Sequence, residues 1–220
     1  MISHLSQMLD PGALAIVLAG TMLATAARCG TRDLRLAGSA ALRLGQDTFD
    51  EDENRVALAR TVHEIKANGL LCAEASLPPD PSLARVVSAY LRHASLEAMH
   101  SARRAERAER EASRGAAVRT FEYAGDLAPV FGLVGTLFAI TQLAPGNGSI
   151  VEGTMAALAT AVLSTLYGVL AAHIFCIPMA RAIERRGERE ELAREQLIDW
   201  LDRHLSDPSP APPARLRDAA

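Results

Sequence analysis

The chain has 220 residues, of which 49% are hydrophobic and only 4% are aromatic, and its formal net charge is −3. This mildly acidic balance gives no reason to expect a nucleic acid as a partner. Scarce aromatic residues and abundant Ala and Leu favour helices over sheets, and no segment alternates as a strand would. The cysteines lack the spacing of metal ligands. We therefore predict an all-α protein with no metal, no cofactor and no enzymatic activity.

The first apolar stretch, from Gly12 to Ala27, follows Asp10 and Pro11 and ends at Arg28. Its position suggests a signal peptide, but a signal peptide carries its basic residues before the apolar run, and here they follow it. The stretch is short for a helix that must cross about 30 Å of bilayer. We nevertheless predict that residues 1–28 form an N-terminal segment and a first transmembrane helix.

Residues 29–122 are polar and charged with a helical pattern, and they form the predicted cytoplasmic region. One helix is expected over residues 34–44 and a second over residues 53–68, with Gly69 as its end. The apolar stripe of the second helix is expected to consist of Val56, Ala59, Val62 and Ile65.

A proline-rich stretch at residues 78–81 predicts a turn, and Ser82 is then a possible N-cap for one long helix that runs towards the membrane. The middle of this helix, SARRAERAEREASR, alternates basic and acidic residues. A solvated face with ion pairs one turn apart is the simpler interpretation of this run. A surface that contacts a partner is the alternative.

Residues 123–180 contain two apolar runs, Leu127 to Leu143 and Thr154 to Ile177, and neither run contains Asp, Glu, Lys or Arg. A turn rich in Pro, Gly, Asn and Ser joins them. Each run is long enough, or nearly so, to cross a bilayer as a helix. A pair of buried helices in a soluble bundle is the alternative, but a soluble helix as long as the second run would normally keep a charged face. We therefore predict a transmembrane hairpin.

Residues 181–205 are predicted to continue the last span as a cytoplasmic helix, packed against the long helix or against a neighbouring subunit. The final residues, 206–220, are rich in Pro and polar, and we expect them to be disordered. The expected apolar side of the helix consists of Leu192, Leu197, Trp200, Leu201 and Leu205.

The distribution of basic residues predicts the orientation of the chain. Residues 1–27 and the turn at 144–153 contain no Lys or Arg, and all basic residues lie within 28–119 and 181–217. By the positive-inside rule the two basic regions are cytoplasmic. The N-terminus and the turn are then outside and the C-terminus inside, which agrees with three spans.

Small residues recur at helical spacing in both hairpin runs, and such residues let helix backbones approach closely in lipid. Packing within one subunit and a subunit face that lines a central space are equally compatible with this pattern. The runs also carry hydroxyls but no carboxylate, whereas a proton pathway usually needs an ionisable group. If this chain conducts ions, we expect a partner to supply the carboxylate. The small residues are Gly132, Gly135, Ala157, Ala161, Ser164, Gly168 and Ala172.

The segments LAPVFGLVGTLFAI and GTMAALATAVLSTLYGVLAAHIFCIPMA resemble the last two spans of the MotA/TolQ/ExbB proton-channel family. STLYG followed by IPMA is similar in particular to the flagellar-motor stator members of this family. The opening DPGALAIVLAGTMLATAAR resembles the second span of those members. The chain is therefore expected to lack their first span and to have the three-span layout of ExbB and TolQ.

The resemblance implies a homopentamer around two copies of a single-span partner of the MotB, TolR or ExbD type, whose Asp carries the proton. It places Thr136 and Thr165 where the pathway threonines of the family lie. It also implies that Pro129 and Pro178 are the two prolines at the cytoplasmic ends of the last two spans. Thr160 stands where ExbB and TolQ carry an intramembrane Glu, which favours stator-like chemistry and makes Thr160 a further candidate for the ion pathway.

In the cytoplasmic region, the stretch KANGLLCAE resembles the part of the stator proteins that faces the rotor, with Lys66 and Glu74 as the charged pair. The resemblance implies a ring-forming stator subunit of an ion-motive-force-driven motor in the bacterial inner membrane, surrounded by lipid and with protons as the expected ion. One alternative is an ExbB/TolQ-like energiser of outer-membrane or envelope processes. An alternative of another class is a non-conducting membrane scaffold.

Overall fold

The computed structural model describes residues 10–46, 49–68, 77–141 and 150–206, and all regular structure within these ranges is helical. Three helices are long and apolar enough to cross a membrane: Pro11–Arg43, Leu96–Thr141 and Gly153–Ser206. The prediction of an all-α membrane protein with three membrane-spanning helices is confirmed. The tail at 206–220 lies almost entirely outside the described residues. The elements are α2 (Pro11–Arg43), α3 (Glu51–Asn68), α4 (Pro81–His93), α5 (Leu96–Thr141), α6 (Ile150–Leu170), the π-helical turn η1 (Ala171–Cys176) and α7 (Ile177–Ser206).

The chain divides into two compact units. The first comprises residues 1–46 and 112–186, and the second comprises residues 47–111 and 187–220. The long helices α5 and α7 contribute to both units. Each unit is assembled from two separate stretches of sequence.

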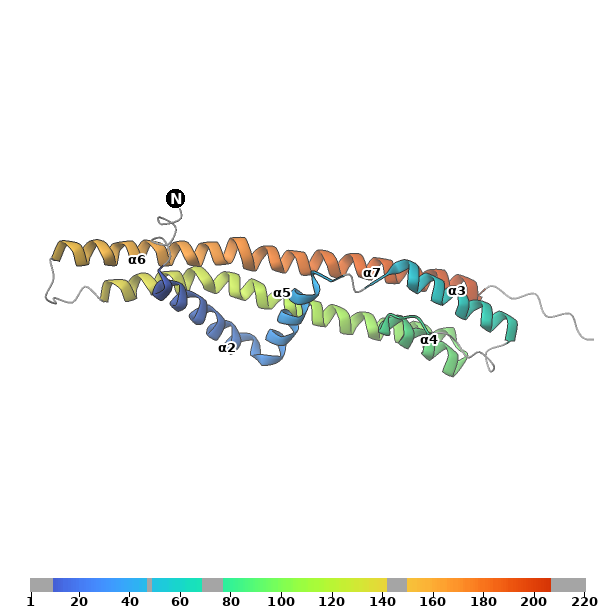
Figure 1. The fold of residues 1–220 in the computed structure, drawn as a ribbon. Coiled ribbons are helices and arrows are strands. Elements are labelled where there is room, and N and C mark those ends of the chain that lie inside the picture. The colour runs from blue at the N-terminus through green and yellow to red at the C-terminus, as the bar shows by residue number, and fades with distance from the viewer. Residues whose placement is uncertain (1–9, 47–48, 69–76, 142–149, 207–220) are drawn as a thin grey trace, which may run out of the picture. The chain divides into compact units, whose positions relative to one another are not determined.

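In the first unit, α2 begins at an N-cap that the sequence analysis did not assign. The Asp10 side chain accepts hydrogen bonds from the backbone N–H groups of Gly12 and Ala13, and Pro11 occupies the first turn. Both features are typical of helix starts. The helix is broken at Gly30, whose φ of 81° and ψ of 166° are non-helical, and Figure 1 shows α2 bent into two parts. The part after Gly30 contains the helix expected over 34–44.

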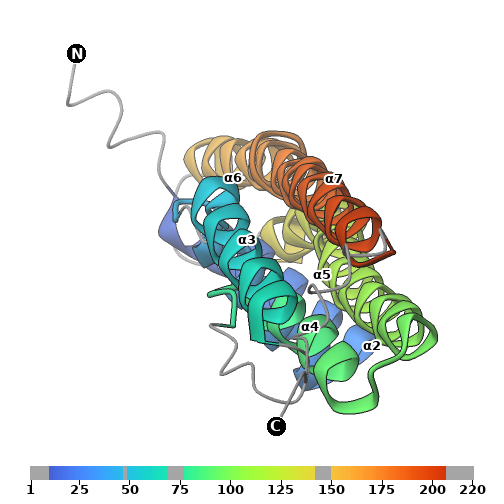
Figure 2. The same ribbon diagram turned by 90° about the vertical axis from the view of Figure 1, so that its right-hand side faces the viewer.

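The hairpin helices α5 and α6 run side by side in close contact (Figure 1 and Figure 2). A Cβ atom on Gly132 would lie 2.9 Å from the carbonyl oxygen of Ser164, and one on Gly168 would lie 2.5 Å from the carbonyl oxygen of Ala128. Gly135 has its would-be Cβ 2.7 Å from the Cβ of Ser164. Only glycine allows the two backbones to come this close. The glycines of the hairpin therefore serve packing within one subunit.

The predicted single helix from Ser82 into the membrane is wrong, because the chain breaks at Ala94. This residue adopts a left-handed conformation with φ of 49°, which ends α4 before α5 begins at Leu96. The N-cap of α4 is Asp80 and not Ser82: its carboxylate accepts hydrogen bonds from the backbone N–H groups of Ser82 and Leu83, both at 3.0 Å. Sequence alone gave no signal for the break, since Ala is a good helix former.

The second unit is built around an apolar core contributed by α3, α4, α5 and α7. Of the expected stripe on α3, Val62 and Ile65 are buried as predicted, whereas Val56 is 51% exposed and Leu58 is fully buried instead. On α7, Leu192 is exposed as well, although Leu197 and Leu201 are buried as predicted. The buried members of this core are Leu58, Val62, Ile65, Leu83, Val86, Val87, Tyr90, Met99, Leu197, Ile198 and Leu201.

The charged run of α5 is paired with α7 within the second unit. The expected ion pairs one turn apart are present, Arg107 with Glu111 and Arg110 with Glu106. The run also pairs with α7 through a ladder of ion pairs between the two helices. Arg110 binds Glu191 through two hydrogen bonds of 2.8 and 2.9 Å. The other rungs are Arg107 with Glu195 and Arg103 with Asp199.

Candidate ion-pathway site

Thr136 on α5 and Thr165 on α6 are both half-buried in the first unit. Each hydroxyl donates a hydrogen bond to a carbonyl of its own helix: Thr136 to Leu133 at 2.6 Å and Thr165 to Ala161 at 3.3 Å. Hydroxyls bonded in this way keep their lone pairs available as acceptors. Two such groups can therefore line a polar track in an otherwise apolar hairpin.

The two threonines lie on the same side of the hairpin. On α6, Thr160 contacts α2, and Thr165 is rotated from it by about 140° at 100° per residue. On α5, Phe131 contacts Gly20 of α2, and Thr136 is rotated from it by the same angle. The glycine contacts between α5 and α6 lie between the side that faces α2 and the side that carries the two threonines. Thr136 and Thr165 therefore define the side of the hairpin that faces away from α2, which we call the threonine face.

The threonines are also close in height along the hairpin. A Cβ atom on Gly132 would lie 3.2 Å from the Cα of Thr165, and Thr136 is one helical turn, about 6 Å, beyond Gly132. The hydroxyls are thus staggered by about one turn on the threonine face.

Thr160 is not brought together with the other two threonines. Its hydroxyl donates a 2.8 Å hydrogen bond to the Asp10 carboxylate at the start of α2, on the flank opposite Thr165. Thr160 lies about 9 Å along the helix from Thr154, where the uncharged run begins. The two hairpin runs contain no carboxylate, but Asp10 brings one against Thr160 from the start of the first span.

The two prolines lie at different kinds of position. Pro129 lies inside α5. A Cβ atom added to Gly168 of α6 would lie 3.1 Å from the Cα atom of Pro129. Pro178 follows the π-helical turn η1, at whose end the Ile177 N–H donates to the Ala172 carbonyl. Proline removes one backbone donor, and π-helical turns concentrate at functional sites in helices. The last span thus has an irregular helix at the end that leads into α7.

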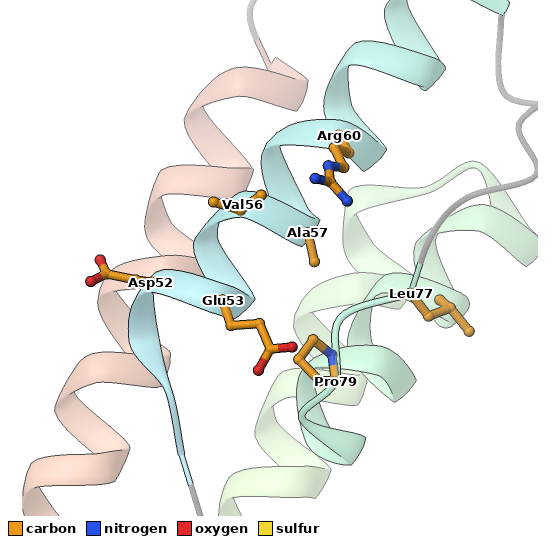
Figure 3. Close-up of a pocket in the computed structure, with 7 residues that line it drawn as sticks. All are labelled: Asp52, Glu53, Val56, Ala57, Arg60, Leu77 and Pro79. Carbon is orange, nitrogen blue, oxygen red and sulfur yellow. The ribbon is translucent and has the colours of Figure 1, made fainter.

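The two candidates for rotor contact are only partly described. Lys66 is exposed in the last turn of α3, and Glu74 lies outside the described residues. Near the start of α3, a pocket of about 570 Å³ opens on the second unit (Figure 3). It combines two carboxylates, one guanidinium and apolar groups, and no cluster of three metal-ligating side chains occurs among the described residues. The pocket is lined by Asp52, Glu53, Val56, Ala57, Arg60, Leu77 and Pro79.

Asp10 is the functional candidate that the sequence analysis missed. The residue pair Asp10-Pro11 before an apolar run is a recognisable helix start. Its partner, however, is 150 positions away in the sequence, and no local pattern predicts such a contact. Tyr167 was missed for the same reason, although its hydroxyl accepts a 3.1 Å hydrogen bond from the Asp10 backbone N–H.

Three apolar spans, a glycine-packed hairpin and hydroxyls on one of its sides define a polytopic helical membrane protein. The chain belongs to the MotA/TolQ/ExbB proton channel family, which residues 77–196 match over more than half of the chain.

Curated relatives match a shorter part of the chain. Motility protein A of Aquifex aeolicus is 30% identical over 86 residues, which are 39% of this chain and 34% of the relative. Chemotaxis protein PomA of Vibrio alginolyticus is 31% identical over 81 residues, 37% of this chain and 32% of the relative. The matches thus span about a third of the length of these relatives.

Solved structures show the same fold over nearly the whole chain. In the flagellar MotAB stator complex from Bacillus subtilis, the matching chain has a TM-score of 0.74 and 22% identity, with 90% of this chain and 79% of that chain covered. MotAB of C. jejuni has a TM-score of 0.72 and 15% identity, with coverage of 93% and 87%.

Proposed function

We propose that this chain is a ring-forming stator subunit of an ion-motive-force-driven motor in the bacterial inner membrane, with protons as the coupled ion. Ions pass along the threonine face, and a single-span partner of the MotB type supplies the Asp that accepts them. Each protonation of that Asp changes its contacts with the ring, and the ring advances by one subunit. The homopentamer around a partner dimer belongs to the same proposal.

The observation that carries this proposal is the position of Thr136 and Thr165 on one side of the hairpin. The glycines of the hairpin pack α5 and α6 against each other and leave this side free. That side carries hydroxyls, and the two hairpin runs contain no charged residue. A hydroxyl track without a titratable group can conduct but cannot store a proton. It therefore needs a carboxylate from another chain, which is what a single-span partner provides.

The test is proton flux into liposomes that contain the chain together with its single-span partner. We expect the double variant Thr136→Val, Thr165→Val to lose flux while the complex still assembles, because Val keeps the shape and removes both hydroxyls. The matched control is Thr141→Val, which removes an exposed threonine hydroxyl bonded to Phe138 of its own helix. Normal flux in the double variant would count against the proposed pathway.

Two other functions make different predictions for the same preparation. A non-conducting scaffold would hold the partner through small-residue packing and would give no flux even in the wild-type complex. An ExbB/TolQ-like energiser would conduct but would drive an envelope process instead of a flagellum. Substitution of Lys66, the described member of the proposed rotor-facing pair, should abolish torque without changing flux only if the load is a rotor.

A further inference from the structure

One residue at the start of the first span makes polar contacts with the third span at two points. The Asp10 Oδ2 atom accepts a hydrogen bond from Thr160 Oγ1 at 2.8 Å, and the Asp10 backbone N–H donates to Tyr167 Oη at 3.1 Å. Its other oxygen, Oδ1, accepts from the N–H groups of Gly12 and Ala13 at 3.0 and 3.2 Å. Asp10 therefore starts α2 and joins it to α6 at the same time.

These contacts lie within the apolar stretch of α6, where a polar link is hard to replace. Thr160 is about 9 Å along the helix from the beginning of the uncharged run at Thr154. A carboxylate in lipid is costly unless it is partnered, and here two backbone donors, one hydroxyl and the positive end of the helix dipole stabilise it. The hydrogen bonds that link α2 and α6 therefore require a defined geometry of the two helices.

The geometry of α6 relates this link to the threonine face. Thr160 and Tyr167 are seven residues apart, close to two full turns, so both project from one side of α6. Thr165 projects about 140° away from Thr160. Two fixed points on one side of a helix set its rotation about its own axis. They consequently set the direction in which the Thr165 hydroxyl points.

We propose that Asp10 is a positioning residue for ion conduction: through Thr160 it fixes the rotation of the third span and so holds Thr165 on the threonine face. This inference rests on the proposed function for its effect on flux, but its effect on the orientation of α6 does not. Thr160 then acts through Asp10 and is not itself a member of the ion pathway.

The test measures the orientation of α6 directly and flux separately, in the full complex with its partner. In a background with the three native cysteines replaced, Thr165→Cys and Thr136→Cys are labelled with a water-soluble thiol reagent. We expect Thr160→Val to lower the labelling rate at position 165 and the proton flux by about tenfold each, the usual value of a lost charge-assisted hydrogen bond. The labelling rate at position 136 on α5 should stay unchanged.

Further variants keep the test decisive if Thr160→Val folds poorly. Asp10→Gly removes the carboxylate at little cost to the helix start, and it should reproduce the change at position 165 without adding to that of Thr160→Val. Thr160→Ser should restore labelling and flux. Unchanged labelling at position 165 in Thr160→Val or Asp10→Gly overturns the positioning role even if wild-type flux is normal. Absent wild-type flux would instead overturn the proposed function, and the labelling comparison would still decide the role of Asp10.

Discussion

At the scale of single residues, Gly168 decides how closely the two hairpin helices approach. A Cβ atom there would lie 2.5 Å from the carbonyl oxygen of Ala128 and 3.1 Å from the Cα of Pro129. Both neighbours are backbone, so the helices must separate to admit a methyl group. We expect Gly168→Ala to lower the free energy of unfolding by about 2 kcal/mol, measured by denaturation of the protein in detergent.

Gly38 in α2 provides the matched control, because a Cβ at this helical position meets nothing within 4 Å. Gly38→Ala should leave stability unchanged or raise it by up to about 1 kcal/mol, since Ala is the better helix former. Equal effects of the two substitutions would mean that the backbone contact at Gly168 does not limit the approach of the helices.

Gly168 and Gly38 show which features of single residues can be predicted from the sequence. Helical spacing identified the small residues of both spans, because spacing depends only on local geometry. It left open whether they pack within the subunit or line a central space, since this depends on the rotation of α6 against α5. The contact between Asp10 and Thr160 joins residues 150 positions apart in the sequence, so it was not predictable from any local pattern.

At the scale of elements, the ion pairs between α5 and α7 stabilise the second unit. The Arg110 and Glu191 side chains are only 23% and 11% exposed and make two parallel hydrogen bonds. We expect Arg110→Ala to destabilise the unit by about 3 kcal/mol, because it leaves a buried carboxylate without its bidentate partner. Trp200, the only tryptophan, packs against the core of this unit and reports its unfolding by fluorescence.

The double variant Arg110→Met, Glu191→Leu distinguishes two quantities: the net contribution of the ion pair to the free energy of unfolding, and the destabilisation caused by removing only one partner. Apolar replacement of both partners is often neutral, because it removes the desolvation penalty together with the attraction. We expect stability close to wild type. A double variant as unstable as Arg110→Ala would show that the loss in Arg110→Ala does not come from leaving the Glu191 carboxylate buried without a partner.

The same pair predicts an acid limit for the second unit. Burial opposes ionisation of Glu191, but the hydrogen bonds from Arg110 and the charges of Arg110, Arg194 and Arg107 outweigh it, so the pKa of Glu191 lies below its usual value. A lowered pKa contributes stability above the unfolded-state pKa of about 4.3, and this contribution is lost as the pH falls through the folded-state pKa. Stability should therefore decline below about pH 5. Glu191→Gln should flatten this decline, whereas substitution of the exposed Glu188 should leave it unchanged.

Element boundaries were harder to predict than element types. The helical character of residues 81–141 was evident from their composition, but the break at Ala94 was not, because alanine there adopts an αL conformation that its sequence neighbours do not encode. The stripe on α3 was half right for a related reason: Val62 and Ile65 are buried as predicted, but Val56 is exposed and Leu58 is buried in its place. Tertiary packing decided both outcomes.

At the scale of the whole molecule, length and charge predicted the spans correctly because lipid imposes simple requirements. A spanning helix needs a long apolar segment, and the three helices that provide one each include all or most of one of the three apolar stretches. The two-unit division was not predictable in this way. Each unit combines sequence-distant segments, and only contacts such as the α5–α7 ion pairs determine which segments belong together.

The same lipid requirements predict how the chain is oriented in the membrane. All Lys and Arg residues lie in 28–119 and 181–217, and none lies in the turn at 144–153. Because basic segments are retained on the cytoplasmic side, a cysteine introduced at Asn147 should react with a membrane-impermeant thiol reagent added outside intact spheroplasts. A cysteine at the exposed position 66 should react only after permeabilisation, in a background free of native cysteines. The reverse labelling pattern would mean that every span has the opposite orientation, with Pro129 and Pro178 towards the outer side of the membrane.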